Sequence, residues 1–277
     1  MSVLRSISYY ARRAAATTRK EGPFEVVRRA LKLADLSPEG YYFHAKYILR
    51  RTLRSYRHEA DPYATIDVDP TQIEYKPVEN WSKWSHMGDI RGGDWDRPGT
   101  YFPDTALYRS LEAHFTDGVA WEDTEIYQKA LNRIEAGDLA WNASFNVEEV
   151  NERCEHLDDL FETIRDEGFK SQPEIRGKPN REIVLSRKWD HFMTDVVVHI
   201  SRDGQFLFCD GRHRFTIARI LGLDSIPVRV VVRHKQWQEI REEIGDARST
   251  SELPDRVRRH LDHPDVQDLL PLSNPSN

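Results

Sequence analysis

The succession of sequence patterns between residues 147 and 232 constrains the fold of this chain more than any other feature. An amphipathic helix is predicted over residues 147–167, and Gly168 directly after it suits the position that ends a helix. The strands predicted after it, from apolar and mostly β-branched runs, are 182–185, 194–200, 205–209 and 228–232. This combination of helix and strands predicts an α/β core.

Two glycine turns are predicted in this part of the chain, one between two strands and one between a strand and a helix. Asp203 and Gly204 form a predicted hairpin turn. Gly211 follows the strand at 205–209 and comes shortly before a helix predicted over residues 215–221. A glycine at such a place lets the backbone approach a ligand closely, and the start of a helix offers free N–H groups and the positive end of the helix dipole. The second turn is therefore a candidate anion site.

The residues of this second turn are chemically suited to phosphate. They are Asp210, Gly211, Arg212, His213 and Arg214. Arginine forks form charge-assisted hydrogen bonds with phosphate oxygens, and a histidine can donate a further one. Among these cations, we expect Asp210 to hold an arginine, to bind a metal ion or to accept a proton from a substrate hydroxyl. The alternative is a surface cap whose arginines pair with acidic residues elsewhere.

Two passages of the chain resemble the ParB/sulfiredoxin nucleotide-binding superfamily. Residues 157–173 resemble its helix followed by Gly-x-x-x-Gln-Pro, and residues 211–228 resemble its Gly-x-x-Arg box, the following helix and an Ile-Pro-Val strand. The resemblance implies an α/β (α+β) fold with a ParB/sulfiredoxin-like core over residues 146–235 and an N-terminal helical extension. The box contacts nucleotide phosphates in this superfamily, and the phosphate contacts implied here are Gly211, Arg212, His213 and Arg214.

The box resembles that of free-serine-kinase-type proteins, Asp-Gly-His-His-Arg, more than those of other branches. Sulfiredoxins carry a nucleophilic cysteine where this chain has Arg212. Partitioning ParB proteins add a helix-turn-helix domain, whereas residues 236–277 are short and acidic, so DNA binding is disfavoured. The resemblance implies a kinase that uses ATP or ADP with Mg²⁺ and phosphorylates a hydroxyl-bearing small molecule or glycan. Asp210 and His213 are its candidate catalytic residues.

A second site element is predicted between residues 81 and 103, where Trp, Gly, Asp and Pro favour an ordered loop over a regular helix. Arg91 is a candidate anion clamp, and carboxylates nearby are candidate ligands of Mg²⁺ or sugar hydroxyls. These carboxylates are Asp89, Asp94 and Asp96. The tryptophans that could stack on a base or sugar are Trp81, Trp84 and Trp95. The alternative is a loop held together by arginine–carboxylate pairs, with the tryptophans filling its core.

Positive charge is concentrated at the N-terminal end. The chain has 277 residues and a net charge of -6, yet residues 1–60 hold 13 Lys or Arg and 5 Asp or Glu. We expect a basic helical arm that packs on the body or lies on an anionic membrane surface. No run reaches the roughly 20 apolar residues that span a bilayer, and no secretory signal is recognisable. These features predict a cytoplasmic protein, peripheral at the membrane if the arm binds lipid.

The expected organisation has four parts: a basic helical arm (1–60), an aromatic-rich part of the body (61–145), the core (146–235) and an acidic helical tail (236–277). The two cysteines, Cys154 and Cys209, are too few for a disulfide scaffold and are expected to be buried thiols. The function class that competes with a kinase is a non-catalytic nucleotide-binding or membrane-associated scaffold, linked to surface-glycan synthesis.

Overall fold

The computed structural model describes residues 46, 49, 56–80, 86–141, 144, 146–177 and 195–270. Most of the predicted basic arm therefore lies outside the described residues, as do Trp81, Trp84 and the strand predicted at 182–185. Within the described part of the chain, no helix combines the length and the apolar character that crossing a membrane requires.

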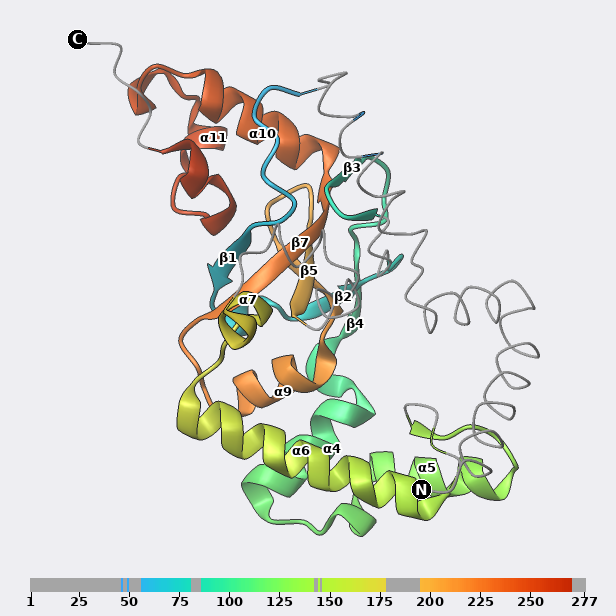
Figure 1. Ribbon diagram of the computed structural model, residues 1–277. Helices are drawn as coiled ribbons and strands as arrows, with labels where there is room; N and C mark the ends of the chain where they lie inside the picture. The colour runs from blue at the N-terminus through green and yellow to red at the C-terminus, as the bar shows by residue number, and fades with distance from the viewer. Residues whose placement is uncertain are drawn as a thin grey trace.

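A single mixed sheet of seven strands forms the centre of the molecule (Figure 1). Its strands are β1 (Thr65–Val68), β2 (Tyr75–Pro77), β3 (Asp89–Arg91), β4 (Pro98–Tyr101), β5 (Val196–Ile200), β6 (Phe206–Asp210) and β7 (Ile226–His234). The order is β1-β7-β5-β6-β2-β4, with β3 also paired to β7. β5 is parallel to β7 and antiparallel to β6, and β2 is parallel to β6. The mixed sheet with its helices confirms the α/β class.

The central strands are continuous apolar runs because both faces of the sheet are covered. All five residues of β5 are buried, including His199, which was expected to be a core residue. The hairpin at Asp203 and Gly204 forms as predicted and joins β5 to β6. β7 continues to His234, beyond the predicted end at residue 232. The prediction stopped too early because Arg233 is charged, but this arginine is buried in an ion pair with Asp265. A buried charge of this kind interrupts the apolar pattern without ending the strand.

Seven α-helices are present among the described residues. They are α4 (Ala106–Asp117), α5 (Glu125–Glu135), α6 (Val147–Glu167), α7 (Gln172–Arg176), α9 (Arg212–Ile220), α10 (Lys235–Asp246) and α11 (Asp255–Arg258). Short 3-10 helices are η1 (Pro70–Gln72), η3 (Phe102–Asp104), η4 (Trp121–Asp123), η7 (Thr250–Glu252) and η8 (Pro264–Leu269). In Figure 1, α4, α5 and α6 lie at one end of the sheet and α10 and α11 at the other.

α6 has the predicted bounds. The Asn146 side chain accepts a hydrogen bond from the Glu149 N–H at 2.8 Å, and Gly168 ends the helix with a φ of 81°. The prediction for α9 was wrong at its start, because the helix begins at Arg212 and not at residue 215. Gly211 is the N-cap residue, in the left-handed conformation, so the charged residues after it form the first helical turn.

The prediction that residues 81–103 form a loop was incomplete. The described part of this segment contains β3, β4 and the start of η3. β3 and β4 are three and four residues long and obtain their backbone hydrogen bonds from β7 and β2. Strands this short are not long enough to show an alternating pattern in the sequence. Their conformation depends on the strands with which they pair.

The main core lies between one face of the sheet and helices α9 and α10. Val198 and Phe208 of the sheet pack in this cluster with Phe215 of α9 and with Trp237 and Ile244 of α10. The C-terminal segment, expected to be an acidic tail, thus contributes residues to the same core as the sheet. A second cluster lies between α4, α5, α6 and the outer side of α9. α9 is therefore held from two sides, which fixes the position of its N-terminal end.

Candidate functional site

The turn between β6 and α9 brings the backbone of Gly211 against β5. Gly211 has φ 84° and ψ 29°, the left-handed conformation that glycine adopts at least cost. A Cβ at this position would lie 2.8 Å from the Asp195 carbonyl oxygen and 2.8 Å from the Val196 Cα. Both conformation and space therefore require glycine here, and the start of α9 is fixed against the start of β5.

Asp195 connects the landmarks of the resemblance to each other. Its side chain is fully buried and accepts hydrogen bonds from Arg229 Nε at 3.0 Å and Nη2 at 2.9 Å. The backbone N–H of Gln172 donates to its other carboxylate oxygen at 2.9 Å. Arg214 of the box lies 3.4 Å from that same oxygen. Asp195 was not among the predicted site residues, although an acidic residue inside a predicted apolar strand is a signal of a buried ion pair.

Arg214 is largely occupied by contacts within the protein. Besides Asp195, its guanidinium donates to the Lys170 carbonyl oxygen and lies 4.3 Å from the centre of the Phe169 ring. Only 12% of the side chain is exposed. Arg214 thus joins α9 to the segment that follows α6, and its contact with phosphate stays a prediction.

Lys76 of β2 places a further cation beside the turn. Its ammonium group lies 5.5 Å from the Phe102 ring centre and 5.8 Å from that of Phe208. Burial lowers the pKa of Lys76, and the nearby Arg212 guanidinium lowers it further. No carboxylate pairs with Lys76 among the residues that the structure describes. The sequence analysis missed this residue, because its proximity to Arg212 depends on the pairing of β2 with β6.

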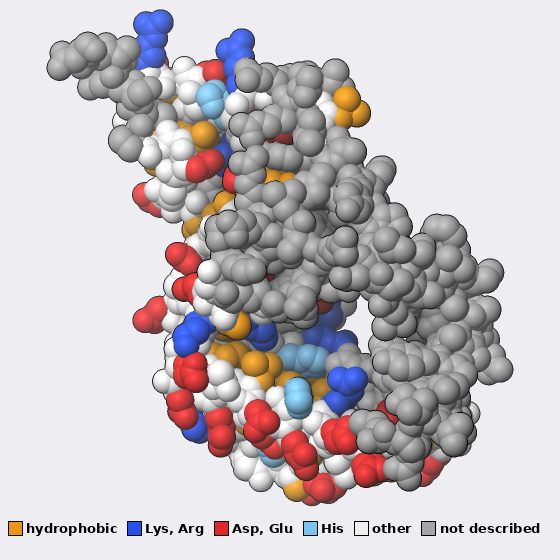
Figure 2. All heavy atoms as spheres, in the orientation of Figure 1, with side chains coloured by type: hydrophobic (Ala, Val, Ile, Leu, Met, Phe, Trp, Pro, Cys, Tyr) orange, Lys and Arg blue, Asp and Glu red, His pale blue; other side chains and the backbone are white. Residues whose placement is uncertain are grey.

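His213 lies in the same positive environment but is itself neutral near pH 7. Burial lowers its pKa to about 4, and the charges of Arg212 and Arg153 act in the same direction. Among the described residues, the charges that perturb the pKa of His213 or of Lys76 are those of Arg212 and Arg153, and both are positive. Figure 2 shows a hollow above the acidic surface of α6 in which Lys, Arg and His side chains gather. The start of α9 is thus an electropositive region that suits an anion.

Asp210 is exposed at the end of β6. One of its carboxylate oxygens accepts a hydrogen bond from the Gly211 N–H at 2.7 Å. Within the described ranges, Asp210 forms no ion pair with an arginine, so its expected role of holding an arginine is not seen there. Metal binding and proton acceptance remain the two predictions for this carboxylate.

The carboxylates of the predicted second element are engaged in ion pairs. Asp89 is buried and lies 2.6 Å from Lys46 Nζ and 2.9 Å from Arg91 Nη2. Asp94 and Asp96 both pair with Arg202, at 2.8 Å and 2.6 Å. These contacts are what the alternative interpretation predicted, a loop held together by arginine–carboxylate pairs. Whether these residues also bind a ligand stays a prediction.

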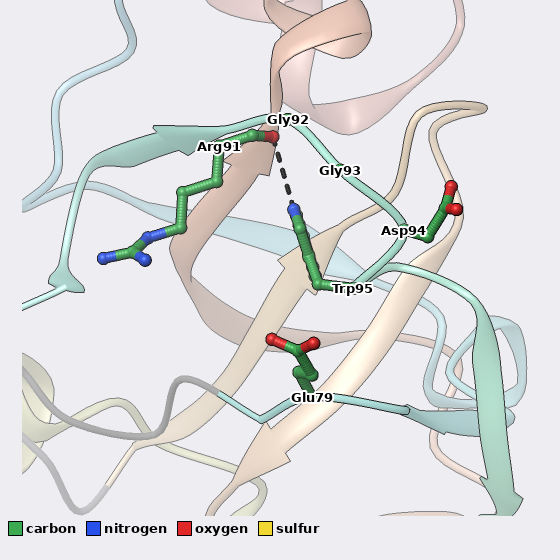
Figure 3. A pocket seen from close by; sticks show the side chains of 6 residues that line it. All are labelled: Glu79, Arg91, Gly92, Gly93, Asp94 and Trp95. Carbon is green, nitrogen blue, oxygen red and sulfur yellow. Dashed lines mark hydrogen bonds between the residues drawn. The ribbon is translucent and has the colours of Figure 1, made fainter.

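Trp95 is buried, but it packs in a cluster with residues of β5, β6 and β7, so it fills a space on the sheet and not a core of the loop itself. It is 4% exposed, and its indole N–H donates to the Arg91 carbonyl oxygen at 3.3 Å (Figure 3). A shallow depression of about 330 Å³ lies beside it, with the Glu79 carboxylate facing the ring. The Arg91 side chain extends away from Asp94 in this view, so the two side chains do not point toward a common ligand position.

The two predicted site elements are not brought together. Asp210 is opposite Val197 near the start of β5, whereas the partner of Asp94 and Asp96 is Arg202, beyond the end of β5. At roughly 3.3 Å per residue, the five residues from Val197 to Arg202 correspond to roughly 16 Å. Asp94 and Asp96 therefore lie at the opposite end of the β5–β6 hairpin from the turn.

Neither cysteine has the environment of a reactive thiol. Burial raises the pKa of Cys154 to about 12, and it also raises the pKa of Cys209 well above its usual range. Both side chains are buried, as expected. The described residues include no group of three or more His, Cys, Asp or Glu side chains arranged to hold a metal ion.

Fold and site together define an α/β protein with an anion-suited turn between a strand and a helix. No protein-family model matches the chain, and no curated protein or solved structure is significantly similar to it. The likeness to the ParB/sulfiredoxin superfamily accordingly rests on the order of its sequence motifs.

Proposed function

We propose that this protein is a nucleotide-dependent phosphotransferase with a ParB/sulfiredoxin-like core, acting on a hydroxyl-bearing small molecule or glycan. The observation that carries the proposal is the concentration of positive charge at the start of α9. Lys76 is half-buried beside Arg212, and within the described residues the pKa values of Lys76 and His213 are perturbed by the positive charges of Arg212 and Arg153. An anion beside Lys76 would offset the cost of partly burying its charge. A nucleotide di- or triphosphate has the charge and the oxygen acceptors for this role.

Each residue of the turn has a separate role in the proposed phosphoryl transfer. The amide groups at the start of α9 donate to phosphate oxygens, and Lys76 and Arg212 neutralise their charge. Arg214 holds the turn in place through Asp195. Mg²⁺ bound with the nucleotide would supply further positive charge against the charge that develops on the phosphates. Asp210 accepts the proton of the acceptor hydroxyl as its oxygen bonds to phosphorus and the nucleotide leaves.

Isothermal titration with ATP, ADP, CTP and GTP in the presence of Mg²⁺ tests the phosphate site. We expect Lys76→Ala to weaken nucleotide binding by about tenfold or more, since a charge-assisted hydrogen bond contributes about 1.5–3 kcal/mol. Lys129→Ala is the matched control, because Lys129 is an exposed lysine of α5 paired with Glu125. Binding that is unchanged in Lys76→Ala would contradict the proposed site.

The role of Asp210 is tested by turnover. Asp210→Asn should abolish acceptor phosphorylation and leave nucleotide affinity largely intact. Equal turnover in this variant would show that another group accepts the proton. Nucleotide binding with slow hydrolysis that no acceptor accelerates would favour the second candidate, a nucleotide-binding scaffold. That candidate is supported by the ion pairs of Asp89, Asp94 and Asp96, because these pairs occupy carboxylates that were predicted to bind Mg²⁺.

We place the protein in the cytoplasm, with residues 1–60 as the region suited to an anionic membrane surface. The excess of Lys and Arg in residues 1–60 supports the anionic membrane surface as a partner. Sedimentation of the full chain with phosphatidylserine vesicles tests it. Failure to sediment with the vesicles would remove the membrane-associated scaffold from consideration.

A further inference from the structure

Three buried polar atoms around the first two turns of α9 have no hydrogen-bond partner among the described residues. They are Trp141 Nε1, His213 Nε2 and Thr216 Oγ1. Trp141 is 8% exposed and Thr216 is fully buried. A buried polar group without a partner costs roughly 1–3 kcal/mol, so such groups normally find one. Their occurrence together beside the positive charges points to a group that is supplied from outside the chain.

Trp141 and His213 lie against each other at the start of α9, near the charges of Arg212 and Arg153. Their ring centres are 6.0 Å apart with an interplanar angle of 60°. The turn that carries Trp141 is fixed, because the Ser144 hydroxyl donates to the Trp141 carbonyl oxygen at 2.9 Å. Arg153 in turn donates to the Ser144 hydroxyl at 3.2 Å. The position of the Trp141 ring is thus set by the protein itself.

The chemistry of the two rings selects the kind of group that fits between them. An indole N–H only donates, whereas a neutral imidazole carries one donor and one acceptor nitrogen. His213 is neutral near pH 7, because burial lowers its pKa to about 4. A hydroxyl can accept from the indole and can either donate to Nε2 or accept from it, so it suits both tautomers of the neutral imidazole. A phosphate oxygen suits only the tautomer in which Nε2 carries the proton.

We infer that Trp141 and His213 form a subsite for a hydroxyl group of a phosphate ester whose phosphate lies at Lys76 and Arg212. The inference rests on the proposed phosphate site and specifies what binds beside it. The ligand class is a phosphorylated sugar or polyol with a free hydroxyl near the phosphate. The ribose of a nucleotide and the sugar of an acceptor share this chemistry.

Trp141→Phe tests the subsite, because it removes the N–H and keeps an aromatic ring. The matched control is Trp121→Phe. Trp121 is also 8% exposed, but its indole N–H donates to Asp158 at 3.0 Å. The probes are ADP, 2′,3′-dideoxy-ADP, glycerol 3-phosphate and inorganic phosphate, each titrated into the full-length protein. Melting temperatures of both variants are measured without ligand.

We expect Trp141→Phe to weaken binding of a hydroxyl-bearing probe by about 5- to 10-fold, the loss of one hydrogen bond, and to leave inorganic phosphate unaffected. A loss for ADP with none for 2′,3′-dideoxy-ADP identifies the ribose as the source. A loss for glycerol 3-phosphate with none for ADP identifies the acceptor. Without ligand, the melting temperature should fall in Trp121→Phe and not in Trp141→Phe, because Trp141 has no hydrogen bond to lose.

Two outcomes would overturn the inference and leave the phosphate site standing. One is unchanged binding of every probe in Trp141→Phe while Lys76→Ala weakens ADP. The other is an equal fall in melting temperature in both tryptophan variants, which would show that Trp141 already has a partner in the free protein, such as a buried water. No binding of any probe by the wild-type protein would overturn the subsite and the proposed function together.

Discussion

Replacing Gly211 by alanine should destabilise the protein more than the same change at Gly118. Both glycines are left-handed, with φ 84° and ψ 29° at Gly211 and φ 71° and ψ 21° at Gly118. They differ in space, because a Cβ at Gly118 meets nothing within 4 Å, whereas one at Gly211 lies 2.8 Å from backbone atoms of Asp195 and Val196. The comparison therefore separates conformational strain from close approach.

The expected magnitudes follow from these two contributions. A left-handed alanine costs about 1–2 kcal/mol at either position. Overlap with backbone that cannot move aside adds about 1–3 kcal/mol at Gly211. Urea unfolding of the two variants should thus differ in unfolding free energy by about 1–3 kcal/mol. Nucleotide affinity should also fall in Gly211→Ala alone, since the start of α9 would be pushed away from β5.

An equal loss of stability in the two glycine variants would refute this reasoning. It would mean that the contact between Gly211 and the Asp195 backbone relaxes at little cost. The turn would then be held by its side chains, and the fixed position of the α9 amide groups would lose its structural basis.

Two further predictions concern buried charge. Asp195→Asn should lower the unfolding free energy by about 3–5 kcal/mol, because it removes the negative charge that pairs with the buried Arg229. The control is Asp166→Asn, which changes an exposed ion pair and should leave urea unfolding unchanged. His213 has a pKa of about 4 in the folded protein against 6.5 as its ordinary value. The unfolded chain therefore binds this proton first, and unfolding free energy should fall by up to ~3 kcal/mol from pH 6.5 to 4, less steeply in His213→Gln. Identical pH slopes would contradict the assignment.

The location of the turn could be predicted from sequence because its signals are local. The apolar run before it, the glycine and the charged residues after it lie within a few positions of one another. The bounds of α6 could be predicted for the same reason, since the helix periodicity and Gly168 are adjacent in the chain. The start of α9 was placed too late because Arg212, His213 and Arg214 interrupt the apolar pattern without interrupting the backbone hydrogen bonds.

The surroundings of the turn could not be predicted in the same way. Lys76 reaches the turn through the pairing of β2 with β6, and Trp141 reaches His213 through packing of the α5–α6 connection on α9. In the sequence, Asp94 and Asp96 cannot be told apart from Asp210 as candidate ligands. In the structure, both pair with Arg202 at the end of the β5–β6 hairpin that lies opposite the turn. No periodicity in the chain encodes these distances.

By itself the sequence determined the α/β class, the glycine turn with its cations and the helix that precedes them, since each follows from residues close together in the chain. Only the tertiary structure decided which charges meet. It buries Asp195 between Arg229 and Arg214, and it brings Lys76 of β2 beside Arg212 at the start of α9. Charges interact through space over a few ångströms, and residues more than a hundred positions apart come within that range only after the sheet has formed.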